Sequence, residues 1–347
     1  MISAKLIANH LQFKLPAGTS RGVLKTKPTW YLALTHQLTG NTGIGECSII
    51  PNLSIDDQPK IENELLKLVE RINANDIPKL HEYTEWPAIK FALETALDDL
   101  AYEEKFTPYP GEFAKGKKTI PINGLVWMGN EDFMKAQIQQ KISEGFDCIK
   151  MKIGAIDFDT ELRILKSIRK NFTPQQIELR VDANGAFSPN EAMSKLEQLA
   201  KFHIHSIEQP IKQNQWKDMA LLTANSPIPI ALDEELIGIT DLGLQIQMIN
   251  FIQPQYIILK PSLLGGIQAS EQWITLAEKN KIGWWATSAL ESNVGLNAIA
   301  QWVSNKETKM LQGLGTGKLF TNNIESPLTI KNGELVNDVN LKWGEIS

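Results

Sequence analysis

From residue 120 onward, short apolar runs of strand length alternate with amphipathic stretches of helical spacing. The runs cover residues 120–126, 148–153, 177–183, 204–209, 228–233, 256–259, 283–287 and 310–314. Strand–helix alternation is typical of parallel strands joined by right-handed crossovers, so eight runs with seven connections predict a closed barrel. No GxGxxG follows any run, which argues against a dinucleotide-binding sheet. We therefore predict an α/β fold built on a modified (β/α)7β TIM-like barrel.

The segments outside this repeat predict a second, smaller unit. Residues 1–50 have the pattern of strands and turns, and apolar stripes predict helices over 57–74 and 86–102. Within the repeat, helices are expected over 131–144, 159–170, 191–202 and 268–280. The pattern between 235 and 255 does not clearly indicate a secondary structure. We predict an α+β capping domain of residues 1–115, to which residues 318–347 return, and a catalytic barrel of residues 116–317.

Composition excludes several classes of protein. The net charge of −5 over 347 residues argues against a nucleic-acid partner. No apolar run approaches the roughly 18 residues that cross a membrane, and the first residues lack the apolar core of a signal peptide. Cys47 and Cys148 are far apart and without CxxC spacing, which fits a reducing compartment. We expect a cytoplasmic enzyme with a small-molecule substrate and no membrane partner; the sequence leaves the oligomeric state open.

Polar residues gather where the predicted strands end, which is where barrel enzymes place their active sites. Strand side chains alternate between two faces, so residues two apart point the same way. Five successive runs end in charged residues, and alternation can send one from each run inward: Lys150 and Lys152, then Asp182 and Asn184, then Glu208, then Asp233 and Glu234, then Lys260. The three carboxylates at 182, 208 and 233 are spaced 26 and 25 residues apart, one strand–helix unit each.

This series predicts a metal-assisted proton abstraction. Asp182, Glu208 and Asp233 would form an all-oxygen site of the kind that Mg²⁺, or Mn²⁺, prefers. Lys152 and Lys260 would face each other across it. To act as a base near neutrality, a lysine needs its pKa of about 10.4 lowered, and burial with nearby cations has that effect. The metal would stabilise the enediolate formed when a proton leaves the carbon beside a carboxylate.

Two other motifs have competing interpretations. His203 and His205 have the spacing of a metal pair, but they lie at the start of a strand and have the parity opposite to Glu208, so packing or surface roles are favoured. Gly265-Gly266 before a predicted helix is compatible with an anion bound at the helix N-terminus or with a simple tight turn.

The ordered series resembles the enolase superfamily. It is carried by Lys150-x-Lys152, Asp182-x-Asn184, Glu208-Gln209-Pro210, Asp233-Glu234 and Lys260-Pro261. Within that superfamily, the segments at 45–48, 121–126, 288–296 and 313–317 are most similar to a dehydratase branch. Dipeptide epimerases usually carry Asp-x-Asp after the last strand; the sequence here is Gly315-Thr316-Gly317-Lys318.

The resemblance implies a role for each matching residue. Lys152 would take the proton and later return it to the leaving hydroxyl, and Lys260 would stabilise the enediolate from the other face. Asp182, Glu208 and Asp233 would bind Mg²⁺, supported by Lys150, Asn184 and Glu234. Ser288 and Glu291 would contact the substrate.

A loop of the capping domain is expected to cover the site. The candidate is the segment 16–22, in which Gly18 and Gly22 permit mobility and Arg21 offers a fork of donors to a substrate carboxylate. A surface turn with a solvated arginine is the alternative, which would leave closure to residues 49–51.

Other chemistries remain open at this point. Racemisation of an N-acylamino acid, or a muconate-type cycloisomerisation, would use the same scaffold. A Schiff-base aldolase would use Lys260 as a nucleophile and would not need the three carboxylates.

Overall fold

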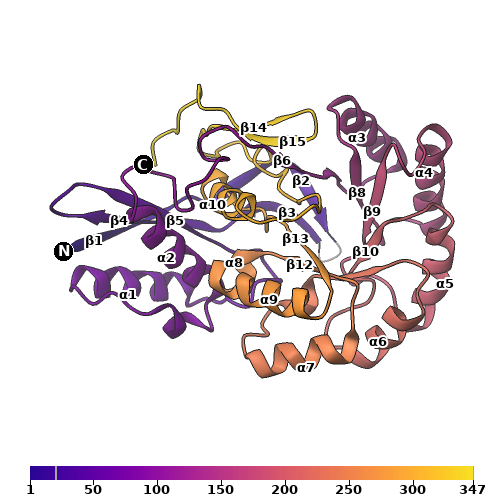
Figure 1. The fold of residues 1–347 in the computed structure, drawn as a ribbon, viewed down its shortest axis with the longest axis horizontal. Coiled ribbons are helices and arrows are strands. Elements are labelled where there is room, and N and C mark those ends of the chain that lie inside the picture. Colours follow the sequence, from indigo (N-terminus) through magenta and orange to yellow (C-terminus); the bar gives the residue numbers. More distant parts are fainter. Residues whose placement is uncertain (20–21, 347) are drawn as a thin grey trace.

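The computed structural model describes residues 1–19 and 22–346. A curled parallel sheet forms the centre of the barrel region, and an antiparallel sheet with two helices lies against one side of it (Figure 1). Within the described residues, no helix is both long and apolar enough to span a bilayer.

The parallel sheet contains seven strands that lie side by side in chain order. They are β7 Gly124–Val126, β8 Cys148–Lys152, β9 Glu178–Asp182, β10 Ser206–Glu208, β11 Ile230–Leu232, β12 Tyr256–Leu259 and β13 Gly283–Ala286. Their outward residues, such as Ile149 and Val181, are fully or almost fully buried against the helices. Strict alternation then turns the polar residues between them toward the barrel axis.

The eighth predicted strand closes the sheet as a short connecting segment. Gln312 pairs with Ile122 next to β7, and Gly313 pairs with Thr287 next to β13. Backbone N–H groups of Gln312 and Gly313 donate to Pro121 at 3.0 Å and to Ala286 at 2.8 Å. The predicted (β/α)7β barrel is therefore confirmed, with its last strand reduced to two isolated bridges.

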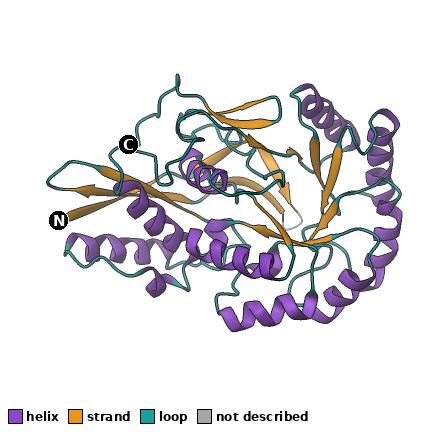
Figure 2. Ribbon diagram, in the orientation of Figure 1, coloured by secondary structure: helices purple, strands orange, loops and turns teal. Residues whose placement is uncertain are grey.

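Helices form the outer layer around these strands (Figure 2). The seven connections contain α3 Glu131–Ser143, α4 Phe158–Asn171, α5 Pro189–Ala200, α6 Trp216–Asn225, α7 Leu242–Ile252, α9 Ile267–Lys279 and α10 Asn293–Ser304. Two short helical turns, η2 Glu234–Leu236 and α8 Pro261–Leu264, follow β11 and β12 directly. The four helices predicted for this region are confirmed to within about two residues at each end.

The capping region combines two antiparallel units. One sheet has the order β1 Ile2–Ala8, β4 Thr29–His36, β5 Thr42–Ser48, and a separate hairpin joins β2 Leu11–Thr19 to β3 Gly22–Lys27. Helices α1 Ile61–Asn73 and α2 Pro87–Leu100, with the short η1 Leu80–Tyr83, complete it. Gly43 and Gly45 let β5 lie directly on α2. A Cβ at Gly45, for example, would come within 1.9 Å of the Ala92 carbonyl oxygen.

The C-terminal tail contacts both regions. Backbone hydrogen bonds of 2.8 and 2.9 Å join Lys14 to Leu319 and Thr321 to Gln12. The tail also forms the hairpin of β14 Leu328–Lys331 and β15 Glu334–Asn337, and β15 pairs with β6 Ile120–Pro121. The division into 1–115 with 318–347, and 116–317, remains our proposal. The pairing of β15 with β6 favours moving that hairpin to the barrel side.

Candidate active site

The strand register brings the predicted site residues together at one end of the barrel. Lys152 lies opposite Asp182 in the β8–β9 pair, and Asp182 lies opposite Glu208 in the β9–β10 pair. Asp233 and Lys260 directly follow β11 and β12. Five consecutive strands thus deliver lysines and carboxylates to a single site, as the alternation pattern predicts.

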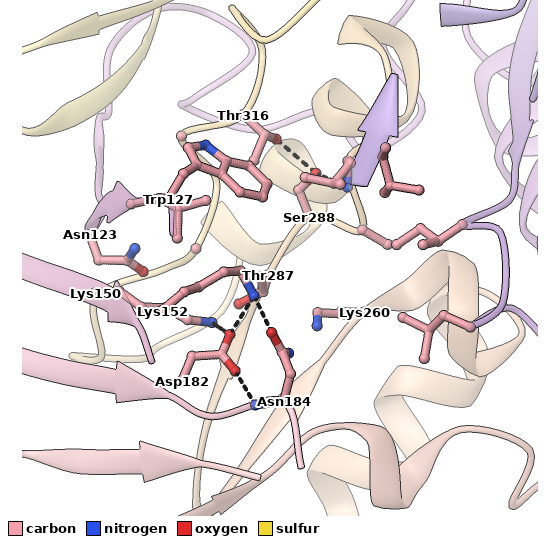
Figure 3. A pocket seen from close by; sticks show the side chains of 18 residues that line it. Asn123, Trp127, Lys150, Lys152, Asp182, Asn184, Lys260, Thr287, Ser288 and Thr316 are labelled. Atoms are coloured by element: carbon pink, nitrogen blue, oxygen red, sulfur yellow. Dashed lines mark hydrogen bonds and ion pairs between the residues drawn. The ribbon is translucent and has the colours of Figure 1, made fainter. Parts of the chain in front are cut away.

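The lysines and carboxylates form one ion-pair network. Lys152 Nζ lies 2.9 Å from Asp182 Oδ2 and donates to Asn184 Oδ1 at 2.7 Å. Lys150 Nζ lies 3.0 Å from the same Asp182 oxygen and also contacts Glu208 Oε2. Figure 3 shows these two lysines entering from one side and Lys260 from the opposite side.

Lys260 completes the network on its own side. Its Nζ pairs with Asp233 Oδ2 and lies 3.8 Å from Glu208 Oε1. Burial would lower the pKa of Lys260, but the two carboxylates beside it outweigh that effect and raise the pKa above its ordinary value of 10.5. This direction is opposite to the one a general base would need, and it depends on both carboxylates being free to face the ammonium group.

The three carboxylates are buried but differ in their electrostatics. Asp182 is fully buried, yet the lysines around it hold its pKa well below the usual range despite the opposing effect of burial. Lys260 likewise holds the pKa of Asp233 below its ordinary value, although burial opposes this. Burial and the neighbouring Asp182 instead raise the pKa of Glu208 well above 4.5. Of the three carboxylates, Glu208 is thus the one whose charged form its surroundings favour least.

Supporting side chains orient this network. Asn184 accepts from Lys152 and donates through Nδ2 to Glu234 Oε1 at 3.0 Å, while its backbone N–H donates to Asp182 Oδ1 at 3.0 Å. Gln209, in the left-handed region with φ of 40°, accepts from the Asp233 backbone N–H at 3.2 Å. Lys150, Asn184 and Glu234 thus lie where the resemblance implies supporting roles.

A cavity lies above the network, and Lys150, Lys152, Asp182 and Lys260 form part of its lining. The barrel contributes alternate residues of the first strand region, Asn123, Leu125 and Trp127, and the cap contributes Leu24, Ile50 and Leu53. Glycines at 313 and 315 line it on the side of the closing segment. The cavity is therefore shared between the two regions, and Ile50 belongs to the segment 49–51 that we named as an alternative cover.

Sequence reasoning missed two polar groups in this cavity. Asn123 Oδ1 and Thr287 Oγ1 line it, are buried, and have no hydrogen-bond partner within the described part of the chain. Buried polar atoms are normally paired, so both are suited to contact a bound molecule. The common parity of Asn123, Leu125 and Trp127 is the signal that could have identified the first.

The three predicted substrate contacts have different outcomes. Ser288 lines the cavity, and its hydroxyl accepts from Thr316 at 2.8 Å and donates to Glu291 at 2.6 Å. Glu291 is fully buried and does not line the cavity. Arg21 lies outside the described residues, between β2, which includes residues 16–19, and β3, which begins at Gly22.

The two ambiguous motifs have structural roles. The ring of His205 stacks on Tyr256 with centroids 5.1 Å apart, which fits the packing role predicted for it. At Gly265-Gly266 the helix N-terminus is occupied by a side chain of the protein itself. The carboxylate of Glu94, from α2 of the cap, accepts from the backbone N–H groups of Ile267 at 2.6 Å and Gln268 at 2.9 Å.

The donor set suits a hard divalent cation. Three buried carboxylates on consecutive strands supply only oxygen ligands, and lysine ammonium groups now balance their charge. Within residues 1–19 and 22–346, no three carboxylate, histidine or cysteine groups converge as a coordination shell. The carboxylates of the trio instead form ion pairs with the lysines. The residues fit the metal by chemistry and position.

Comparison with known proteins decides the family. Residues 133–338 match the family described as Enolase C-terminal domain-like. The chain belongs to the enolase superfamily. The predicted resemblance is thus confirmed, and enzymes of this superfamily depend on a divalent metal ion.

Its relatives define the branch. The chain is 49% identical to the o-succinylbenzoate synthase of Desulfotalea psychrophila, over 94% of this chain and 96% of that protein. The crystal structure of MenC from the same organism matches with a TM-score of 0.86 and 44% identity, covering 96% of this chain and 99% of that one.

More distant structures share the fold. The L-Ala-D/L-Glu epimerase of Bacillus subtilis matches with a TM-score of 0.80 at 20% identity, covering 99% of this chain and 97% of that one. The chain therefore lies in the o-succinylbenzoate synthase family, with epimerases and cycloisomerases as structural relatives.

Proposed function

We propose that this protein is an o-succinylbenzoate synthase of menaquinone biosynthesis. It would convert 2-succinyl-6-hydroxy-2,4-cyclohexadiene-1-carboxylate into 2-succinylbenzoate and water. The observation that supports this most strongly is the 49% identity to such an enzyme over 94% of the chain. The buried free thiols Cys47 and Cys148 fit a reducing compartment, and we propose the cytoplasm.

Asp182, Glu208 and Asp233 would hold the metal, which we propose to be Mg²⁺, with Mn²⁺ as a substitute. A related dipeptide epimerase from Cytophaga hutchinsonii was solved in complex with Mg. When bound, the cation supplies Lewis-acid stabilisation of the enediolate and takes up the carboxylate charge that now raises the pKa of Lys260.

Lys152 would carry out both proton transfers. Its amine takes the proton from C1, beside the ring carboxylate, and the electron pair forms the enediolate. The electrons then return to form the new ring double bond as the C6–oxygen bond breaks, and Lys152 gives its proton to the departing hydroxide. One C–H and one C–O bond are lost, one water leaves, and the ring becomes aromatic. The Asn184–Glu234 pair orients the Lys152 amine through the 2.7 Å bond to Asn184.

Lys260 would act as a fixed positive charge on the opposite face of the substrate. Its position between Asp233 and Glu208, across the cavity from Lys152, suits electrostatic stabilisation of the enediolate. Asn123, Thr287 and Ser288 would contact the substrate away from the ion-pair network.

The test is turnover of the cyclohexadiene substrate, followed by the ultraviolet change on aromatisation. We expect turnover with Mg²⁺ or Mn²⁺, none after exhaustive chelation, and recovery on metal addition. Activity that survives chelation would contradict the metal site. A parallel incubation with an N-succinylamino acid in D₂O tests racemisation: α-proton exchange without turnover of the diene would assign the racemase function instead.

A further inference from the structure

A buried carboxylate of the cap holds the barrel helix that follows Lys260. Glu94, on α2, accepts through its two oxygens from the backbone N–H groups of Ile267 at 2.6 Å and Gln268 at 2.9 Å. These are the first two residues of α9. A carboxylate at this position satisfies N–H groups that have no partner inside the helix and meets the positive end of the helix dipole. The contact therefore fixes where α9 begins relative to the cap.

A short turn of helix and two glycines connect Lys260 to α9. Lys260 immediately precedes α8, and its carbonyl oxygen accepts from the backbone N–H groups of Leu263 at 2.8 Å and Leu264 at 3.1 Å. Gly265 and Gly266 follow with φ of 95° and 100°. Isolated helices as short as α8 are not stable in water, so α8 takes its orientation from what surrounds it.

Helix α2 is the neighbour that packs on this corner. Figure 1 shows α8 lying beside α2, with which it is in contact. An added Cβ at Gly266 would lie 1.9 Å from Glu94 Oε2 and 3.7 Å from the Cα of Phe91, and one at Gly265 would lie 3.6 Å from Lys90 Cδ. A single turn of α2 thus supplies both the close backbone approach and the carboxylate.

The orientation of α8 matters to the active site. Leu263 of α8 is buried and packs with Ile50 and Ala289, which both line the cavity. Lys260, at the start of the turn, pairs with Asp233. A shift of α8 would move the ammonium group of Lys260 relative to the carboxylates and the cavity, and displacements of about 1 Å are enough to slow a reaction severely.

A second carboxylate of the cap makes the same kind of contact with the next barrel helix. Glu46, on β5, is fully buried and accepts from the backbone N–H groups of Ser292 and Gly295, both at 2.7 Å, and from the Ser292 hydroxyl. These donors lie at the start of α10, which follows the cavity-lining residues Ser288 and Leu290. The cap therefore holds the helices behind two successive segments of the active site.

We propose that Glu94 is a positioning residue for Lys260: through the start of α9 and the turn of α8, it fixes the cationic face of the active site to the cap. Glu94 does not line the cavity formed by the described residues, so its effect reaches the reaction through Lys260. This inference deepens the proposed function and rests on it, because the role of Lys260 belongs to that function.

The experiment compares Glu94→Ala and Glu94→Gln with Asp99→Ala in the full-length enzyme. Asp99 is the matched control because it is a fully buried carboxylate on the same helix and also accepts from two backbone N–H groups, those of Ile44 at 2.9 Å and Thr107 at 2.6 Å. Neither donor lies on a segment that carries the ion-pair network. Circular dichroism and melting temperature are recorded for every variant.

The first measurement is amide hydrogen exchange over residues 260–268, without metal or substrate. Glu94→Ala should exchange this segment at least about tenfold faster than wild type, because the corner loses its anchor, and Asp99→Ala should leave it at the wild-type rate. Glu94→Gln keeps one accepting oxygen and should fall between. Wild-type exchange in Glu94→Ala would overturn the proposal. Since this measurement needs no turnover, it stands even where the proposed function fails.

The second measurement is kcat and KM with Mg²⁺ and the cyclohexadiene substrate at pH 8, where Glu94, with a pKa of about 7, is ionised. Glu94→Ala should lower kcat about 10- to 50-fold and leave KM within about threefold of wild type, since a displaced charge weakens stabilisation of the enediolate more than substrate binding. Asp99→Ala should lower the melting temperature and keep the wild-type kcat.

Combination with Lys260→Ala separates positioning from general loosening. If Glu94 acts through Lys260, the double variant should turn over within about twofold of Lys260→Ala, measured with enzyme in excess. A further loss in the double variant, a kcat for Glu94→Ala within twofold of wild type, or an equal loss in Asp99→Ala would each contradict the proposal. If Glu94→Ala fails to fold, Glu94→Gln takes its place, and effects on exchange and kcat smaller than about threefold then contradict it.

Discussion

Replacing Glu94 should change how the stability of this protein depends on pH. Glu94 is 3% exposed, and burial raises the pKa of its carboxyl group from 4.5 to about 7, although the N-terminal N–H groups of α9 oppose the shift. The folded state therefore binds a proton more tightly than the unfolded state does. The stability contributed by this proton is complete below about pH 4.5 and is lost as the pH rises toward 7.

The size of the effect follows from the shift. At about 1.4 kcal/mol per pKa unit, the rise from 4.5 to about 7 corresponds to a total of about 3.5 kcal/mol, of which about 2.5 kcal/mol is lost between pH 5 and pH 8. For a chain of this length, that loss lowers the melting temperature by roughly 3 °C. Glu94→Gln keeps an oxygen that can accept from Ile267 or Gln268 and cannot ionise, so the variant should lack this part of the pH dependence.

The assay is thermal unfolding of wild type and Glu94→Gln from pH 5 to pH 8 at constant ionic strength. The control is Glu62→Gln, which changes an exposed carboxylate on α1. The melting temperature of wild type relative to Glu94→Gln should fall as the pH rises, and the control should follow wild type. Parallel curves for wild type and Glu94→Gln would refute the argument that Glu94 is protonated on folding.

Three further predictions concern the site and its frame. Lys152→Ala and Lys260→Ala should each lower kcat at least about a hundredfold with an unchanged circular dichroism spectrum; near-normal kcat in either would remove that lysine from the chemistry. Asn123→Val should raise the melting temperature, because it removes a buried amide oxygen that has no partner, and should lower kcat/KM about tenfold; unchanged kinetics would mean that the amide does not touch the substrate. Gly266→Ala should destabilise the fold by about 2 kcal/mol or more in urea unfolding, since φ is 100° and a Cβ would lie 1.9 Å from Glu94 Oε2; wild-type stability would contradict the strain.

Local pattern was sufficient for the elements that have one apolar face. The alternation around Lys150 and Lys152 predicted which side chains point inward. The spacing of one strand–helix unit between carboxylates predicted that the carboxylates lie on neighbouring strands. The pattern failed at α7, because this helix is apolar on more than one side. Its residues Leu242, Ile246 and Phe251 are 48%, 40% and 52% exposed, so no stripe marks the buried face.

Contacts between distant segments could not be predicted from the sequence. Glu94 lies more than 170 residues before the helix that it caps, and Glu46 is 246 residues from Ser292. In the sequence, both carboxylates are indistinguishable from solvated charges. Glu291 was predicted from a sequence motif to contact the substrate. Only the packing shows that its carboxylate accepts hydrogen bonds from Ser262 and Ser288 and lies outside the cavity lining.

The return of the tail to β6 has a consequence for the timing of biosynthesis. Strand β6 immediately precedes the first barrel strand, yet its partner β15 is Glu334–Asn337, and β2, which pairs with β3, also bonds to residues 319–321 of the tail. At about 5–20 residues per second, the ribosome needs roughly 10–45 s to make the 230 or so residues that follow residue 115. Throughout that interval, the first segments lack the strands that complete them. Both β6 and the tail-facing side of β2 therefore stay without these partners until residues 319–337 have been synthesised.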